Sequence, residues 1–463
     1  MKTADVAIIG GSAAGLMAAI TLRKRYPGKK VLLVRDVTQT PVPCGIPYIY
    51  GTLGAVQKDI IADDKFLEMG IEIIHDTVTA IQRDKKTVTF AAHDTLAYDK
   101  LILASGSKPL LPPMPGIDLG NVFTIKKDPE HLQLIYTRLQ KAKNVVVIGG
   151  GFIGVEMAEQ IAKMGGATCK DYFCTAEESG SSLQVTIIEM LPHCLMLACE
   201  EEFCLQAENE LRKMGINVLT NSRVEALEGN GTVSAVKLAN GKSIPADIVI
   251  IGIGAIPNID LAQQGDIDAD PRSGVVVNEF MQTNDPDIYA AGDCASKFSL
   301  ITGKPTGIRL ASVACSEGMI AASNLYGIPR KTMGALGAFG TTVGNRSIAA
   351  AGLTTKAAAD EGIEVVIGEA QAPNRHPGGL PGCIPDMKAK LLFRKSDGVI
   401  VGGHISGGEA SADMVNIIAV AIQGEMTAEQ LATMQYATHP LLTASPLAYQ
   451  VMLAAENAAV ALG

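Results

Sequence analysis

A cysteine in an unusual setting, PVPCGIPYIYG at residues 41–51, is the first candidate for chemistry in this sequence. Cys44 lies between Pro43 and Gly45, and the residue five positions on, Ile49, offers no second thiol for a disulfide. An accessible thiol that spends time as thiolate can attack sulfur or be oxidised. The following segment, GIPYIYGTLG, is expected to begin a helix, whose N-terminus would lower the pKa of the thiol. A buried structural cysteine is the alternative, because free cysteines are often small hydrophobic residues of the core.

A glycine motif in the second quarter of the chain indicates a nucleotide site. Gly149, Gly151 and Gly154 form G-x-G-x-x-G between a predicted strand, KNVVVIG, and a predicted helix. In that context the first glycine makes the turn, and the second lets the backbone approach a pyrophosphate. The third lets the helix pack close to the sheet. An ordinary βα turn is the alternative, which the strand and helix on either side disfavour.

Glu189 ends the next predicted strand, LQVTIIEM. A carboxylate at this point accepts hydrogen bonds from a ribose diol and repels the 2′-phosphate of NADP, so it favours NAD. Residues 167–182 are interpreted as an insertion between helix and strand, which places Glu189 farther from the glycines than is usual.

A similar but less regular unit begins the chain. The stretch GGSAAG, residues 10–15, lies between a predicted strand and a predicted helix. Ser12 replaces the middle glycine, so the backbone approaches a phosphate less freely there. The next strand, VLLVRD, ends in Arg35 and Asp36. Asp36 can hold a ribose, although Arg35 stands about where a carboxylate is usual.

The elements that position these residues predict the fold class. Two strand–glycine loop–helix–strand units are joined by further buried strands that end in glycine loops, and from about residue 326 a hairpin and a helix follow. This order predicts an α/β protein with two Rossmann-like dinucleotide-binding domains of three layers each and a C-terminal α+β domain.

Composition limits the classes of function. A chain of 463 residues holds two to four domains, and its net charge of −9 disfavours nucleic acid as a partner. Nine cysteines in this length do not form a secreted disulfide scaffold. No apolar stretch reaches the ~20 residues of a membrane span. A cytoplasmic protein without a membrane partner is expected.

Five stretches in order, AIIGGSAAG, LILASGSKP, VVVIGGGFIG, GIGAIPN and DIYAAGDCA, resemble the pyridine nucleotide-disulfide oxidoreductases, flavoproteins that bind two dinucleotides. The resemblance covers essentially the whole chain and implies FAD in the first unit, NAD(P)H in the second, and a homodimer; Glu189 favours NADH over NADPH. It implies an FAD domain of residues 1–120 and 245–325, an NAD(P)H domain of residues 121–244, and a dimerisation domain of residues 326–463.

The resemblance also implies the residues that contact each cofactor. For FAD these are Gly10, Ser12, Ala13, Ala14, Gly15, Arg35, Asp36, Pro43, Ala104, Ser105, Gly106, Gly292, Asp293 and Ala311. For NAD they are Gly149, Gly151, Phe152, Ile153, Gly154, Glu156, Glu189, Gly252, Ile253 and Gly254. A helix N-cap is the alternative role of Asp293, since aspartate is a favoured cap.

The stretch CGIPY narrows the resemblance to members with a single redox cysteine: coenzyme A disulfide reductases, persulfide or polysulfide reductases, NADH oxidases and NADH peroxidases. The implied function is transfer of electrons from NADH through FAD and Cys44 to a disulfide or persulfide, such as coenzyme A disulfide, coenzyme A persulfide or polysulfide. The alternatives are an NADH oxidase or peroxidase that reduces O2 or peroxide, and a reductase that delivers electrons to a partner protein.

Further residues follow from the same resemblance. His439 in THPLLTASP is implied as a catalytic acid that acts across the dimer, and nearby Tyr436 as an alternative acid. The carboxylate that normally orients the histidine is absent. Arg23 and Thr40 are implied as contacts of a coenzyme A substrate, although Pro43 stands where the coenzyme A disulfide reductases have asparagine. For the basic run that contains Arg23, a solvated helix end is an equal alternative.

The remaining chemistry-bearing residues carry weaker signals. His376 in RHPGG is interpreted as a loop or interface residue. Five cysteines have spacings that fit no metal or iron–sulfur pattern, and are interpreted as thiols without a redox role: Cys169, Cys174, Cys194, Cys199 and Cys204. No metal site is expected.

Overall fold

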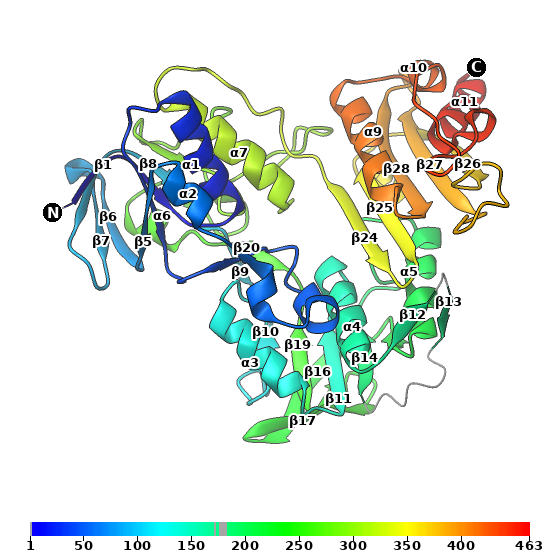
Figure 1. Cartoon of the computed structure of the whole chain (residues 1–463), viewed down its shortest axis with the longest axis horizontal. Helices are drawn as coiled ribbons and strands as arrows, with labels where there is room; N and C mark the ends of the chain where they lie inside the picture. Colours follow the sequence, from blue (N-terminus) through cyan, green and yellow to red (C-terminus); the bar gives the residue numbers. More distant parts are fainter. Residues whose placement is uncertain (1, 171–172, 176–182) are drawn as a thin grey trace.

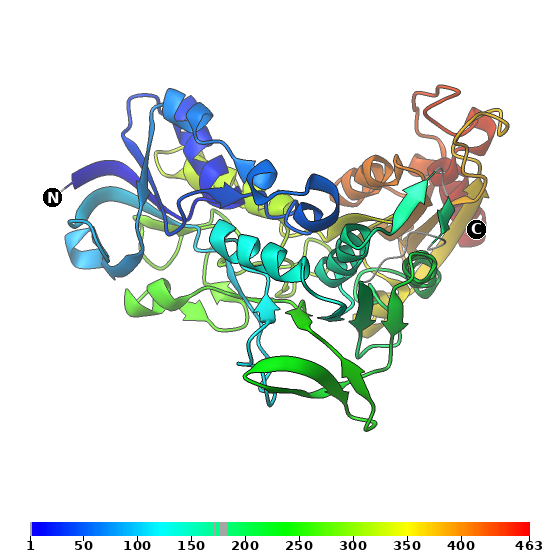
Figure 2. The same cartoon turned by 60° about the horizontal axis from the view of Figure 1, so that its bottom comes forward.

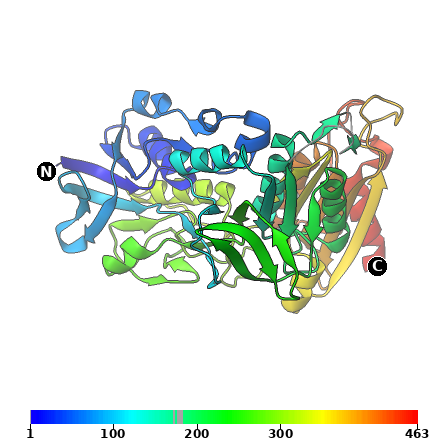
Figure 3. The same ribbon diagram turned by 90° about the horizontal axis from the view of Figure 1, so that it is seen from below.

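The computed structural model describes residues 2–170, 173–175 and 183–463 of the chain. Three bodies follow one another in Figure 1: one built from the N-terminal residues and a later green segment, one coloured cyan to green, and one coloured yellow to red. The N- and C-termini lie at opposite ends of the molecule in Figures 1, 2 and 3.

The first body is a sheet of order β5-β2-β1-β8-β7-β6, with β23 beside β8. Strands β5, β2, β1, β8 and β23 are parallel, and β6 and β7 are antiparallel additions. The strands are β1 (Lys2–Ile9), β2 (Val31–Arg35), β5 (Ile71–His75), β6 (Val78–Gln82), β7 (Thr87–Phe90), β8 (Leu96–Leu103) and β23 (Ile288–Ala290).

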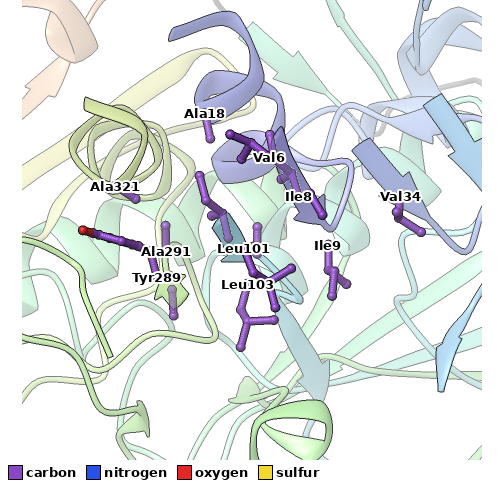
Figure 4. Packing of buried hydrophobic residues seen from close by; sticks show 14 of the residues in the cluster. Val6, Ile8, Ile9, Ala18, Val34, Leu101, Leu103, Tyr289, Ala291 and Ala321 are labelled. Carbon is purple, nitrogen blue, oxygen red and sulfur yellow. The ribbon is translucent and has the colours of Figure 1, made fainter. Parts of the chain in front are cut away.

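Helices α1 (Ala13–Arg25) and α7 (Ala311–Asn324) pack against each other beside this sheet. Figure 4 shows Ala18 of α1 and Ala321 of α7 among the apolar side chains of β1, β8 and β23. Their contact is close: a Cβ at Gly318 would lie 2.3 Å from the carbonyl oxygen of Ala14. Small residues at the contact therefore fix the separation of the two helices.

The second body is a five-stranded parallel sheet of order β10-β19-β11-β14-β15. One face packs on helices, and the other packs on an antiparallel three-stranded sheet, which extends from the lower edge in Figure 2. The elements are β10 (Val122–Thr124), α3 (Pro129–Leu139), β11 (Asn144–Ile148), α4 (Phe152–Met164), β14 (Gln184–Ile188), α5 (Glu201–Lys213), β15 (Asn217–Leu219), β16 (Val224–Asn230), β17 (Thr232–Leu238), β18 (Ser243–Pro245) and β19 (Ile248–Ile251).

One expected domain boundary differs from the structure. Strand β19 pairs with β10 and β11, so residues 248–251 belong to the second sheet and not to an FAD domain that resumes at residue 245. The chain returns to the first body through β20 (Ala255–Pro257), which pairs with β9 (Ser107–Pro109). These two short strands are the crossing between the bodies.

The third body is an antiparallel sheet of order β24-β25-β28-β27-β26. Helices cover one face, and on the other face His404 stacks against Phe203 of α5, with ring centroids 5.3 Å apart. The sheet is therefore fixed to the second body. Its elements are β24 (Ala338–Val343), β25 (Arg346–Gly352), β26 (Val365–Ala372), β27 (Met387–Arg394), β28 (Ile400–Gly407), α9 (Ser411–Gln423), α10 (Ala428–Ala432) and α11 (Gln450–Leu462).

Shorter elements complete the described chain. They are β3 (Thr40–Pro41), a π-helix (Ile49–Leu53), 3-10 turns at Val56–Asp59, Arg83–Lys85 and Pro446–Ala448, β4 (Ile60–Ile61), α2 (Asp64–Glu68), β12 (Thr168–Lys170), β13 (Phe173–Thr175), α6 (Asp260–Gln264), β21 (Ala269–Asp270), β22 (Gly274–Val275) and α8 (Thr355–Asp360). The rest of the 167–182 insertion lies outside the described residues. Within the described residues, no helix combines the length and the apolar character needed to cross a membrane.

Candidate active site

The first glycine loop lies where β1 ends and α1 begins. Gly10 has φ +117°, and a Cβ there would lie 2.0 Å from the carbonyl oxygen of Ala104 at the end of β8. A Cβ at Gly15 would lie 1.9 Å from the carbonyl oxygen of Gly10. Ser12 precedes the helix and its side chain makes no capping hydrogen bond. The loop therefore leaves the N-terminus of α1 open to a pyrophosphate, as an FAD site requires.

Two further loops meet the start of α1. Gly292 has φ +82°, and a Cβ there would lie 2.9 Å from Cβ of Ala14. Asp293 accepts a hydrogen bond of 2.8 Å from the hydroxyl of Ser107, so the loops after β8 and β23 are joined beside the helix. Most of the predicted FAD contacts thus come together at the carboxyl ends of β1, β8 and β23, where such folds bind ligands.

Arg35 and Asp36 have different surroundings at the end of β2. The Arg35 side chain is buried and pairs with Asp63, and it donates to Thr40 and to the backbone of Thr38. Its charge is therefore satisfied within the protein. Asp36 is exposed directly after the strand, where a ribose carboxylate belongs.

The second glycine loop has the context that its motif predicts. Gly149 has φ +108°, and a Cβ at Gly154 would lie 1.8 Å from the carbonyl oxygen of Gly149. Gly151 precedes α4 and has open space where a side chain would be. The loop of residues 252–254 lies against it, because the carbonyl oxygen of Gly252 is 2.5 Å from a Cβ built on Gly149. This arrangement has the close backbone packing and the open helix N-terminus that the predicted pyrophosphate site requires.

Glu189 lies beside this cradle, directly after β14. Its carboxylate accepts the backbone N–H of Gly150 at 2.5 Å and that of Leu191 at 2.7 Å. The insertion before β14 therefore leaves Glu189 at the strand end, as expected.

Cys44 is an exposed free thiol in the turn after β3. Partial burial raises the pKa of the Cys44 thiol, and Glu156, Asp59 and Asp293 add to the rise, while Lys127 opposes it. Because Glu156 belongs to α4 of the second body and Asp293 follows β23 of the first, Cys44 lies where the two dinucleotide units face each other.

The helix expected after Cys44 differs in the structure. Residues 43–47 form turns and a five-residue π-helix follows at Ile49–Leu53, so no regular α-helix N-terminus is directed at the thiol. The expectation of a lowered Cys44 pKa was wrong for this reason, since burial and neighbouring carboxylates raise that pKa. Ile49 and Tyr50 instead pack into the core of the second body, and Thr52 donates to the side chain of Gln160 on α4 at 2.7 Å.

Glu156 and Phe152 lie on the face of α4 that contacts the third body. Glu156 accepts a hydrogen bond of 2.9 Å from the Thr341 hydroxyl, and burial raises the pKa of its carboxyl to about 7. Phe152 stacks on Phe339 of β24, with ring centroids 5.1 Å apart. Both predicted NAD contacts therefore adjoin the C-terminal sheet.

His439 and Tyr436 lie on the third body, and neither is among the groups that shift the pKa of Cys44 within one chain. The Tyr436 hydroxyl donates to the carbonyl oxygen of Pro446, and its ring stacks on Tyr449. His439 is exposed. The backbone N–H of His376 donates to the carbonyl oxygen of Pro440. The loops that contain His376-Pro377 and His439-Pro440 therefore lie together.

The two predicted substrate contacts have structural roles instead. Arg23 donates to the backbone carbonyl oxygens of Met69, Pro27 and Lys29 at 2.7–2.9 Å. Thr40 is buried and its hydroxyl donates to the carbonyl oxygen of Gly11. The Thr40 hydroxyl and the Nε and Nη1 groups of Arg23 are therefore engaged within the first body.

The remaining cysteines show no metal arrangement within the described residues. Cys194, Cys199 and Cys204 are buried among the apolar residues of the second body, where burial holds the pKa of each thiol high. Cys169 and Cys174 face each other in the register of β12 and β13, and their side chains lie outside what the structure describes.

Asp59 and Lys127 are neighbours of Cys44 that the sequence did not indicate. Lys127 comes from the segment before α3, far along the chain, and no motif surrounds either residue. Only the folded arrangement brings these charges to the thiol.

Two glycine-loop folds, a thiol between them and a C-terminal antiparallel sheet together define a two-dinucleotide oxidoreductase. Residues 4–318 match the family model "Pyridine nucleotide-disulphide oxidoreductase", and residues 339–447 match the dimerisation domain of the same family. The chain belongs to this family, and the predicted resemblance and fold class are confirmed. The family implies FAD and NAD(P)H as cofactors.

Two named relatives have different activities. The chain is 32% identical to an NADH oxidase of Methanocaldococcus jannaschii, over 97% of this chain and 98% of that protein. It is 31% identical to an NAD(P)H coenzyme A polysulfide/persulfide reductase of Pyrococcus horikoshii, over 84% of this chain and 86% of that protein. The solved structure of an NAD-dependent persulfide reductase from A. fulgidus is similar at 29% identity and a TM-score of 0.87, over 97% of this chain and 82% of that one.

Proposed function

We propose that this protein is a flavoprotein reductase that uses NADH to reduce a sulfur–sulfur bond at Cys44. The observation that carries the proposal is the position of Cys44, an exposed thiol among charged residues of both dinucleotide units. A thiol in that place can meet a substrate from solvent and a flavin from the first unit.

The two cradles fit the two cofactors. Gly10, Ser12 and the loops at residues 104–107 and 292–293 would hold FAD, which accepts a hydride from the nicotinamide and delivers an electron pair to sulfur. Gly149 to Gly154 would hold the nicotinamide dinucleotide. The carboxylate of Glu189 favours NADH over NADPH, because it repels a 2′-phosphate at the ribose.

Cys44 would act as the nucleophile. Its thiolate attacks one sulfur of the substrate, a mixed disulfide forms on Cys44, and the other sulfur leaves as a thiolate that takes up a proton. His439 of a second copy is proposed as the donor of that proton, since the third body matches a dimerisation domain and its two His-Pro segments are clustered.

Coenzyme A disulfide, coenzyme A persulfide or polysulfide is the proposed substrate class, supported by the similarity to reductases of that name. Thr40 is buried and would not contribute to its recognition, and Arg23 is already bonded to three backbone carbonyl oxygens. Lys24 and Arg25 are exposed at the end of α1 and are the remaining candidates there for phosphate contacts.

An NADH oxidase or peroxidase is the second candidate, favoured by the similarity to an NADH oxidase over nearly the whole chain. The same lone thiol would then cycle through a sulfenic acid, with O2 or peroxide as the acceptor. A reductase for a partner protein would leave Cys44 without a role.

The Cys44→Ser variant separates these functions. Anaerobic holoenzyme is reduced with NADH, and coenzyme A disulfide, polysulfide, O2 and peroxide are then added one at a time. We expect the wild type to turn over the sulfur acceptors and the variant to lose that turnover. Full turnover of a disulfide by the variant contradicts the proposal. Preference of the wild type for O2 or peroxide supports the second candidate.

A further inference from the structure

Asp59 is held directly beneath the turn that carries Cys44. Strands β3 and β4 pair in an antiparallel ribbon, and the N–H of Val42 donates to the carbonyl oxygen of Asp59 at 2.7 Å. The Asp59 side chain then reaches the turn, because its Oδ1 lies only 1.9 Å from the position of a Cβ built on Gly45. Any side chain at position 45 would collide with this carboxyl group.

One oxygen of the Asp59 carboxyl is buried without a hydrogen-bond partner. The residue is 3% exposed, and its Oδ2 has no hydrogen-bond partner. The nearby hydroxyl of Tyr50 is likewise buried and unpartnered. Buried polar groups in native proteins are nearly always hydrogen-bonded, so an orphaned carboxyl beside a reactive thiol calls for a functional explanation.

The charge of Asp59 acts on the thiol. Burial raises the pKa of Asp59 to about 6, so this carboxyl changes charge within the working range of a cytoplasmic enzyme. Its negative charge raises the pKa of Cys44, as do those of Glu156 and Asp293. The other titratable groups that face the turn are Lys127 before α3, Tyr48 of the turn itself and Cys315 of α7.

We propose that Asp59 is a positioning residue for Cys44, whose carboxyl supports the turn at Gly45 and whose charge sets the reactivity of the thiol. Ionised Asp59 suppresses the thiolate, and protonated Asp59 releases it. The thiolate population of Cys44 therefore falls less steeply as the pH drops through the range in which Asp59 is protonated. The inference deepens the proposed function, since it concerns the same thiol, but it rests on the geometry of the turn and not on the identity of the electron acceptor.

The charge is tested by alkylation of Cys44. Oxidised FAD-bound enzyme is treated with iodoacetamide between pH 5 and 9, and the modified peptide containing Cys44 is quantified by mass spectrometry. In the wild type the rate should fall by less than tenfold per pH unit around pH 6, where Asp59 is protonated. In Asp59→Asn the rate should fall more steeply around pH 6, leaving only the flattening near pH 7 that Glu156 causes, and the rate at pH 7.5 should rise about threefold or more. Asp64→Asn, which removes an exposed carboxyl nearby, should match the wild type.

If the alkylation rate of the wild type falls tenfold per pH unit throughout, without a shoulder near pH 6, the role of the Asp59 charge is overturned. This outcome can be read from the wild type alone. An Asp59→Asn profile that superimposes on the wild type overturns it as well. The two proposals remain distinguishable because they are tested by different measurements. Turnover of sulfur acceptors by Cys44→Ser tests the proposed function, and the pH profile of Cys44 alkylation in Asp59→Asn tests the role of Asp59. Neither result determines the other.

The support at Gly45 is tested separately. Gly45→Ala should slow alkylation of Cys44 at every pH, because the new methyl group displaces the turn. The double variant Gly45→Ala/Asp59→Ala should recover most of the rate, since the space beneath residue 45 is then open. Equal rates in Gly45→Ala and the wild type, or no recovery in the double variant, contradict the positioning role.

Discussion

The hydroxyl of Thr341 lies 2.9 Å from a carboxylate oxygen of Glu156, and this bond joins the C-terminal sheet to the helix of the second glycine loop. The same helix is bonded to the C-terminal sheet at a second point, where the N–H of Gly344 donates to Glu159 at 3.0 Å. The C-terminal sheet therefore takes part in shaping the predicted nicotinamide site.

Glu156 should make stability depend on pH. Burial raises the pKa of its carboxyl from 4.5 to about 7, so the folded state binds a proton that the unfolded state releases in that interval. Stability is therefore lost as the pH rises from the unfolded to the folded value. Glu156→Gln, which retains an acceptor for Thr341, should melt a few degrees above wild type at pH 8 and close to it at pH 5. The measurement is the melting temperature of each protein as a function of pH, with the exposed Glu228→Gln as control. Profiles of wild type and Glu156→Gln that run parallel from pH 5 to pH 8 would contradict the prediction.

Glu189 should determine the choice of dinucleotide. Replacing it with alanine and the exposed Met190 with arginine removes the repulsive carboxylate and adds a cation for a 2′-phosphate. We expect the ratio of kcat/KM for NADH to that for NADPH to fall by about tenfold or more. The measure is flavin reduction by each nucleotide. Glu225→Ala, in the same body, is the control, and a wild type that already prefers NADPH would refute the assignment.

Gly292 should be irreplaceable in the first cradle. Alanine there combines φ +82° with a methyl group 2.9 Å from that of Ala14. We expect a loss of about 1–3 kcal/mol in the free energy of unfolding and a lower FAD content after purification. Gly303→Ala, with φ +67° and open space around the new methyl group, isolates the backbone contribution. Equal FAD contents in the two variants would show that crowding at Ala14 is unimportant.

His439 should act on the thiol of the other copy. His439→Gln is expected to lower sulfur reduction by about 100-fold, the usual scale for loss of a general acid. Dimers that combine one Cys44→Ser chain with one His439→Gln chain contain one complete site, so mixing the two inactive proteins should restore activity. Turnover after subunit exchange is the measurement. A mixture as inactive as its components would indicate that histidine and thiol do not cooperate across the dimer.

Arg23 should matter for folding more than for substrate. Arg23→Met loses three hydrogen bonds to backbone carbonyls, and we expect about 2 kcal/mol less stability. The KM for coenzyme A disulfide should change less than about twofold, because Nε and Nη1 of Arg23 already hold three backbone carbonyl oxygens of the first body. Denaturant unfolding and steady-state kinetics are compared with Lys24→Met, an exposed neighbour. A large rise in KM with unchanged stability would restore Arg23 as a substrate contact.

The sequence predicted what depends on short-range pattern. Both glycine loops, the strand-end position of Glu189 and the hairpin and helix of the C-terminal α+β domain follow from local sequence patterns. The charges around Cys44 do not, because Asp59, Glu156 and Asp293 come from three separate parts of the chain. The prediction of a regular α-helix after Cys44 was wrong, because the segment packs against α4 as turns followed by a π-helix. The boundary at residue 245 was wrong because β19, which follows that residue, is still a strand of the second sheet. The chain leaves the second body only after β19.

The π-helix after Cys44 belongs by sequence to the first body but is anchored on α4 through Thr52 and Gln160. The Cys44 segment is thus attached to the body that carries the second glycine loop. Any displacement of that body relative to the first would therefore also displace Cys44. Binding of a dinucleotide to the second body would then be coupled to the position of the Cys44 thiol and to its exposure to solvent.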